Sequence, residues 1–116
     1  MTTRQDKVNE FLRKEVTEII YRELKDPRIG FVTITGVEVT SDLRHAKIYF
    51  SVMGSLEEKQ SNLKLLKNAE SFIRLTLRKR MHTKVIPQVH FVEDDSVERG
   101  SRIMELLEEI KSDDDK

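Results

Sequence analysis

The 116-residue chain contains no cysteine and no tryptophan, and only two prolines and four glycines. The absence of cysteine excludes disulfides, thiolate metal sites and a cysteine nucleophile, and it fits a reducing compartment. No apolar run is long enough to span a bilayer, and the first residues are charged rather than signal-like. We therefore expect a cytoplasmic protein that is neither exported nor inserted into a membrane.

The motifs of common enzyme classes are also missing. There is no Gly-x-x-x-x-Gly-Lys loop, no Gly-x-Ser-x-Gly elbow and no His-Glu-x-x-His helix. The three histidines, His45, His82 and His90, lack close ligand spacing and are interpreted as ordinary surface or strand residues. Asp94 and Asp95 are adjacent, as paired catalytic carboxylates seldom are, and Asp95 is better placed to cap a helix. These features predict a protein that is not an enzyme and needs no metal or cofactor.

The net charge is zero, but the charges are unevenly distributed along the chain. Residues 56–92 hold eight Lys/Arg and three Asp/Glu, a net charge of +5, whereas residues 93–116 hold four and ten, a net charge of −6. A basic middle attracts phosphate and an acidic end repels it. Binding to a polyanion is therefore expected on one face only.

The first half of the chain has the pattern of a helix followed by a hairpin. Residues 3–6 have capping-box spacing, and apolar residues then recur at three- and four-residue intervals to Leu24, which predicts a helix of about five turns. The Asp-Pro-Arg-Ile-Gly segment at 26–30 ends this helix. Strands at 31–40 and 46–52 should pair antiparallel, and a change of apolar phase across Gly36 predicts a β-bulge.

A second helical stretch is predicted from the capping box at Ser55 to about Met81. A straight helix would place Glu70 inside the buried apolar stripe, and a break near Ala69 would relieve that conflict by letting the second half rotate. The alternative is a straight helix whose Glu70 reaches solvent, and periodicity alone does not separate the two.

After Pro87 the pattern predicts a short strand at 88–92, a last helix from Asp95 and a disordered acidic tail at 112–116. The order is helix, strand, strand, helix, helix, strand, helix. This is the pattern of an α+β sandwich, in which helices cover one face of a three-stranded sheet.

Basic side chains in the second helical stretch point to phosphate binding. Arg74 and Arg78 lie one turn apart, so both guanidinium groups can face one phosphate track. A solvated helix face is the alternative, but no acidic residue lies between Glu70 and Glu93, and solvated faces usually mix their signs. A membrane-surface helix is a weaker reading because the apolar face is narrow and lacks tryptophan. The predicted set is Arg74, Arg78, Lys79, Arg80 and Lys84, extended by Lys64 and Lys67.

Aromatic residues are few, and four of them, Phe31, Phe50, Phe72 and Phe91, fall at core-like positions. No platform for stacking bases is therefore evident. Tyr49, on the polar side of its strand, is the one candidate for stacking, with an edge-facing structural role as the alternative. Recognition would then depend on backbone phosphates and RNA shape.

Several stretches together resemble one known family. In the first half these are Asp-Pro-Arg-Ile-Gly at 26–30, Val-Thr-Ile-Thr-Gly-Val at 32–37 and Asp-Leu-Arg-His-Ala-Lys-Ile-Tyr at 42–49. In the second half they are Ala-Glu-Ser-Phe-Ile-Arg at 69–74, Pro-Gln-Val-His-Phe at 87–91, and the segment from Asp95 through Gly100 to Leu107. Over nearly its whole length the chain resembles the ribosome-binding factor A family.

The resemblance implies a single KH-like domain of type II topology over residues 1–111, with residues 112–116 as a disordered acidic tail. In this family a helix-kink-helix with an Ala-x-Gly motif replaces the usual Gly-x-x-Gly turn, which matches the break inferred at Ala69. Ser71 stands at the glycine position, so this chain departs from the motif at the kink.

The resemblance also implies a function: binding to free small ribosomal subunits near the neck, late maturation of the rRNA including its 5′ end, and growth in the cold. It implies no catalysis, a monomer, and a small-subunit GTPase as a partner in release. A protein-interaction module that docks through its acidic C-terminal helix is the alternative. The residues assigned to RNA are Ala69 and Ser71 at the kink, Arg74, Arg78, Lys79, Arg80 and Lys84 for phosphates, and Lys7 and Arg28 as secondary contacts.

Overall fold

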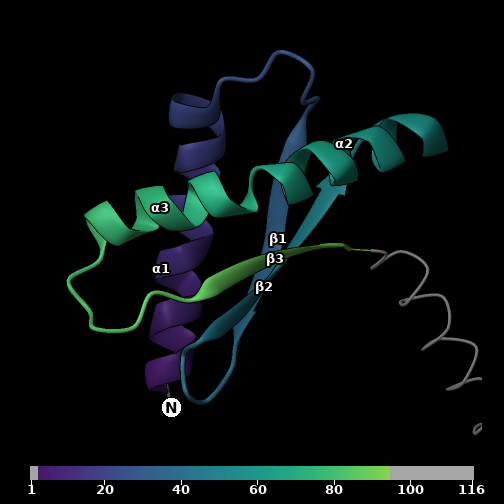
Figure 1. Cartoon of the computed structure of the whole chain (residues 1–116). Coiled ribbons are helices and arrows are strands. Elements are labelled where there is room, and N and C mark those ends of the chain that lie inside the picture. Colours follow the sequence, from purple (N-terminus) through teal and green to yellow (C-terminus); the bar gives the residue numbers. More distant parts are fainter. Residues whose placement is uncertain (1–2, 95–116) are drawn as a thin grey trace, which may run out of the picture.

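A computed structural model describes residues 3–94 as helices packed on a three-stranded sheet (Figure 1). The elements are α1 (Arg4–Glu18), η1 (Ile19–Leu24), β1 (Val32–Val39), β2 (His45–Val52), α2 (Leu56–Asn68), α3 (Glu70–Arg80) and β3 (Gln88–Glu93). The predicted α+β sandwich is confirmed. The helix predicted from Asp95 and the tail at 112–116 lie outside the described residues.

The N-terminal helix begins with the predicted capping box. The Thr3 hydroxyl accepts a hydrogen bond from the Asp6 amide at 3.1 Å, and the Asp6 carboxylate accepts one from the Thr3 amide at 3.0 Å. α1 continues as the π-helical turn η1, which keeps the adjacent Ile19 and Ile20 both buried. The helix ends at Lys25, whose φ of 46° is left-handed, directly before the segment at 26–30 that the sequence predicts as its end.

The sheet has the order β1-β2-β3, with β1 antiparallel and β3 parallel to β2. The register between β1 and β2 shifts between Ile34 and Gly36, so Thr35 is the extra residue of a bulge. Because of this shift, Val32, Ile34, Val37 and Val39 are all buried on one face, which confirms the bulge predicted around Gly36.

The second helical stretch is broken at Ala69, which ends α2 and begins α3 with φ −89° and ψ −4°. The two helices cross the sheet with a bend between them (Figure 1). The predicted break is confirmed, and the straight-helix alternative is wrong. Glu70 does not reach for solvent: its carboxylate accepts a hydrogen bond from the Phe91 amide in β3 at 2.8 Å, which satisfies a part-buried charge.

Of the four phenylalanines that the sequence places at core-like positions, two lie in the core. Phe50 and Phe91 are buried and meet edge to face, with ring centroids 6.0 Å apart. The core-like assignment is wrong for Phe31 and Phe72, which are 73% and 42% exposed. Phe31 precedes β1, and Phe72 lies off the side of α3 that buries Ile73, so rotation at the break does not cover it.

Candidate nucleic-acid interface

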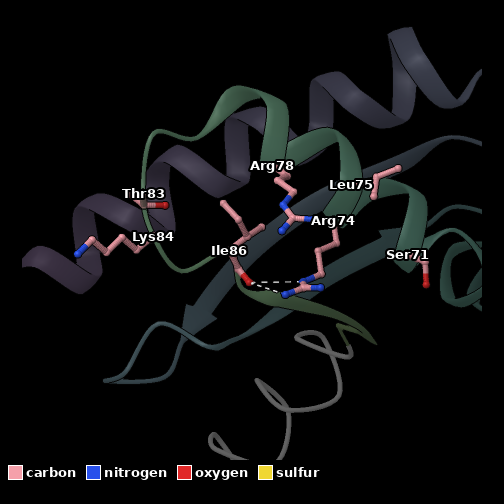
Figure 2. Close-up of a pocket in the computed structure, with 7 residues that line it drawn as sticks. All are labelled: Ser71, Arg74, Leu75, Arg78, Thr83, Lys84 and Ile86. Carbon is pink, nitrogen blue, oxygen red and sulfur yellow. Dashed lines mark hydrogen bonds between the residues drawn. The ribbon is translucent and has the colours of Figure 1, made fainter.

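A groove of about 490 Å³ lies between α3 and the connection from α3 to β3 (Figure 2). Basic side chains reach it from both sides: Arg74 and Arg78 extend from α3, and Lys84 belongs to the connection. Figure 2 shows both arginines extending toward Ile86, whereas Lys84 points away from them along the connection. The groove is lined by Ser71, Arg74, Leu75, Arg78, Thr83, Lys84 and Ile86.

Arg74 is positioned by the backbone of the connection. Its Nη2 and Nε atoms donate to the Ile86 carbonyl oxygen at 3.2 and 3.4 Å, while the side chain stays exposed. Because a guanidinium carries five N–H donors in a fixed fork, this contact orients the group and leaves donors for a phosphate. The same bond holds the connection next to α3, just before β3 begins.

A second hollow of about 390 Å³ adjoins the first, because Arg74, Lys84 and Ile86 line both. It adds Arg44, from the turn between β1 and β2, to the basic surface. The Arg44 carbonyl accepts a hydrogen bond from the Gln88 amide at 2.8 Å, which continues the parallel pairing of β2 and β3. Sequence reasoning missed Arg44, since no local pattern indicates a parallel pairing across some forty residues.

The kink residues have different surroundings. Ala69 is 8% exposed and packs into the core at the break, whereas Ser71 is exposed and lines the groove. Within residues 3–94, positive φ occurs only at Lys25, Leu43 and Gly54. The helix break therefore forms without a left-handed backbone at Ser71, and serine at the glycine position of the motif carries no strain of that kind.

Arg80 differs from its basic neighbours because its charge is already matched within the domain. Its side chain is 23% exposed, and its guanidinium donates to Glu15 and Glu23 at 2.8 Å each and lies 3.6 Å from Glu18. The hydrogen bonds to Glu15 and then Glu23 raise the pKa of Arg80. This network joins the end of α3 to α1 and η1.

The structure does not bring the other predicted basic residues into the groove lining. Lys79 is exposed at the end of α3, and Lys64 and Lys67 are exposed on α2. Arg28 donates to both carboxylate oxygens of Asp26, from Nε at 3.0 Å and from Nη2 at 2.8 Å. Lys7 lies on α1 beside a separate hollow.

Polar side chains on the sheet pair with one another. The Tyr49 hydroxyl donates to Glu38 at 3.2 Å, which gives Tyr49 a structural contact. His45 and His90 stack with centroids 5.3 Å apart, and His45 Nδ1 lies 3.1 Å from His90 Nε2. No group of three potential metal ligands occurs between residues 3 and 94. No helix in that range combines the length and the apolar character needed to cross a membrane.

The chain matches curated relatives along most of its length. It is 46% identical over 108 residues to the ribosome-binding factor A of Thermomicrobium roseum, covering 93% of this chain and 84% of that protein. It is 48% identical over 112 residues to the protein of the same name in Geobacter metallireducens, covering 97% and 95%.

Solved structures share the fold. A Thermotoga maritima protein determined by NMR has 31% identity and a TM-score of 0.74, covering 82% of this chain and 91% of that one. The crystal structure of ribosome-binding factor A from Thermus thermophilus has 22% identity and a TM-score of 0.69, covering 78% and 97%. A homology model of the Thermus factor, fitted into the cryo-EM map of its complex with 30S, has 24% identity and a TM-score of 0.61, covering 72% and 88%.

The family model for ribosome-binding factor A matches residues 4–107. That range spans every helix and strand described above, including the broken helix and the basic groove beside it. The fold, the relatives and the family match agree, and the chain belongs to the ribosome-binding factor A family.

Proposed function

We propose that this chain binds free small ribosomal subunits through the groove beside the α2–α3 break and assists late maturation of their rRNA, including the 5′ end. The observation that carries the proposal is the gathering of Arg74, Arg78, Lys84 and Arg44 on two adjoining hollows next to that break. The 30S complex of the Thermus factor supports the choice of target. Binding alone suffices, and no catalytic step is part of the proposal.

The charges on this surface predict how strongly binding should depend on salt concentration. Arg74, Arg78, Lys84 and Arg44 line the two hollows, and the exposed Lys79 at the end of α3 adds a fifth cation outside their lining. Arg80 serves first to join α3 to α1. Neutralising about five phosphates predicts that log K falls with log salt concentration with a slope of roughly −3.5 to −4.5. A slope near zero would contradict phosphate contact through this surface.

The proposed mechanism is a shift of population. By holding one conformer of the maturing rRNA, the domain raises the fraction of subunits in that conformer by its preferential affinity for it. The family resemblance extends the proposal to a ribosome-associated GTPase that acts in release, to action as a monomer in the cytoplasm, and to growth in the cold. Ser71 and the backbone around Ala69 would approach the RNA most closely.

The test is cosedimentation of the purified chain with free small subunits and with complete ribosomes at two salt concentrations. The variant is Arg74→Glu/Arg78→Glu, and the matched control is Arg13→Glu/Lys14→Glu, which makes the same charge change on α1. We expect salt-sensitive binding to free subunits only, lost in the groove variant and kept in the control.

Equal binding by the groove variant would move the interface elsewhere. The acidic C-terminal residues then become the candidate, because residues 93–116 carry a net charge of −6. In that case reversing the charges of Glu105, Glu108 and Glu109 should weaken binding more than reversing Arg74 and Arg78. Those glutamates lie outside the described residues, so this alternative stands on charge alone.

A further inference from the structure

A hollow with an apolar floor lies between the first turns of α1 and the connection from α3 to β3. Its volume is about 320 Å³. The residues that line it are Arg4, Lys7, Val8, Phe11, Arg80, Met81, His82 and Thr83. It differs from the basic groove because its floor is made of aliphatic and aromatic side chains.

The floor owes its position to the spacing of residues on α1. Positions 4, 7, 8 and 11 follow one another at intervals of three, one and three, which places them on one face of the helix. The next residue, Leu12, is completely buried, whereas Phe11 is 38% exposed. Val8 and Met81 pack partly against the core on either side. An aromatic ring thus stays accessible beside packed aliphatic groups.

The rim of the hollow is basic. Arg4 and Lys7 are exposed on α1, and His82 and Thr83 are exposed on the opposite side. Arg80 also lines the hollow, but its charge is matched by Glu15 and Glu23. The positive charge available to a ligand therefore comes from Arg4 and Lys7.

The hollow adjoins the basic groove. Thr83 lines both, and its neighbour Lys84 lines the groove. A polyanion that contacts Arg74 and Arg78 on α3 and Lys84 on the connection therefore lies next to this hollow. This adjacency favours nucleic acid over an acidic peptide as the occupant.

We propose that the hollow receives one unstacked base of single-stranded RNA, which stacks on Phe11 while Arg4 and Lys7 contact the adjoining phosphates. The inference rests on the proposed RNA-binding function and deepens it, because it adds recognition of a base to a surface otherwise built for phosphates. A volume near the small end of ligand pockets suits a single base. Aromatic stacking accepts any base, so the site selects unpaired RNA rather than a sequence.

The absence of tryptophan in the chain makes a specific spectroscopic test possible. Phe11→Trp places the single tryptophan at the floor of the hollow. Phe31→Trp places it instead on an exposed site just before β1, outside the lining of the hollow. The probes are an oligoribonucleotide of about eight nucleotides and an abasic chain of the same length. We expect the oligoribonucleotide to quench the fluorescence of the Phe11→Trp variant only, and the abasic chain to quench neither.

Affinity gives a second readout. Phe11→Ala should weaken binding of the oligoribonucleotide by about 5- to 150-fold without changing the salt slope, because stacking releases no counterions. Lys7→Gln should instead reduce the slope by about 0.7. Phe31→Ala is the matched control and should bind as the parent does. Phe11→Tyr keeps the ring and should restore affinity, which separates lost stacking from a loss of folding.

Unchanged affinity in Phe11→Ala, or equal binding of the abasic chain, would overturn the inference. Quenching of the Phe11→Trp variant by an acidic apolar peptide but not by RNA would do so too, and would assign the hollow to a protein partner. If RNA binding is lost in Arg74→Glu/Arg78→Glu but unaffected at Phe11, the inference alone fails. If the parent chain binds neither RNA nor small subunits, the proposed function fails with it.

Discussion

The first residue of α3 is tied to the middle of β3: the Glu70 carboxylate accepts a hydrogen bond from the Phe91 amide at 2.8 Å. Among the strands of residues 3–94, β3 pairs with β2 alone, so this side chain occupies a backbone donor on the side of β3 that faces away from β2. The bond therefore fixes the direction in which α3 leaves the break at Ala69.

Replacing Glu70 should loosen both the edge strand and the break. In Glu70→Ala the Phe91 amide loses its acceptor, and we expect a loss of about 1–3 kcal/mol in the free energy of unfolding. Glu70→Gln keeps an oxygen acceptor and should lose less. Urea unfolding followed by circular dichroism measures both, and equal stability of parent and Glu70→Ala would show that water replaces the carboxylate freely.

Replacing Arg80 should lower the stability of the domain and leave its affinity for RNA nearly unchanged. Arg80→Met leaves Glu15, Glu18 and Glu23 close together without their shared cation. Because the network is partly exposed, we expect a loss of about 1 kcal/mol in stability, and a smaller loss in Arg80→Gln. The slope of RNA affinity against salt should stay close to that of the parent. A fall in the slope as large as that of an Arg78→Gln variant would place Arg80 among the phosphate contacts.

Arg44 is expected to behave as a member of the RNA surface although sequence patterns did not point to it. It lines the hollow that Arg74 and Lys84 share with the groove. Arg44→Gln should reduce the salt slope by about 0.7 to 0.9, the value for one phosphate contact. Titrations of small subunits at several salt concentrations measure this, with Arg13→Gln as the control that leaves the slope unchanged.

Ser71 gives a test of the kink itself. Since this residue does not need a positive φ, Ser71→Gly relieves no strain and only adds freedom to the unfolded chain. We expect Ser71→Gly to lower the free energy of unfolding by about 0.5–1 kcal/mol, measured by urea unfolding. Stabilisation by glycine would mean that the backbone there prefers a conformation that serine resists.

The Asp26 and Arg28 pair predicts a small dependence of stability on pH. Hydrogen bonds from the Arg28 side chain, and then from its backbone amide, hold the pKa of Asp26 below its ordinary value. A lowered carboxyl pKa in the folded state stabilises the protein above the unfolded-state value and loses that effect as pH falls through the folded-state value. Asp26→Asn should therefore be less stable than the parent at neutral pH and equal to it well below pH of about 4. A difference that persists in acid would point to a steric cause.

Local patterns predicted most of the fold. Three features depend only on residues close together in the sequence: the capping box at residues 3–6, the bulge near Gly36 and the break at Ala69. Periodicity and turn chemistry therefore suffice to predict them. The same reasoning placed Phe31 and Phe72 in the core, because residue type and spacing do not say which helix side, or which residue beside a strand, lacks a neighbour to cover it.

The site was harder to predict because its contacts are distant in sequence. Arg80 meets Glu15 across 65 residues and Glu23 across 57, and no spacing rule distinguishes it from Arg78 or Lys79. Arg44 reaches the basic surface only through the parallel pairing of β2 with β3. Charge counting indicated α3 but not which of its cations are already paired with carboxylates of the same domain.

The pairing of β3 with β2 also sets when the basic surface is assembled. Arg44 and Arg74 lie on segments made early and late in synthesis, and they share a surface only once residues 88–93 have joined the sheet. A nascent chain in which β3 has not yet formed has scattered positive charges but no assembled surface. Under the proposed function, completion of this pairing therefore comes before binding, since a chain without it does not yet present the face that would contact ribosomal RNA.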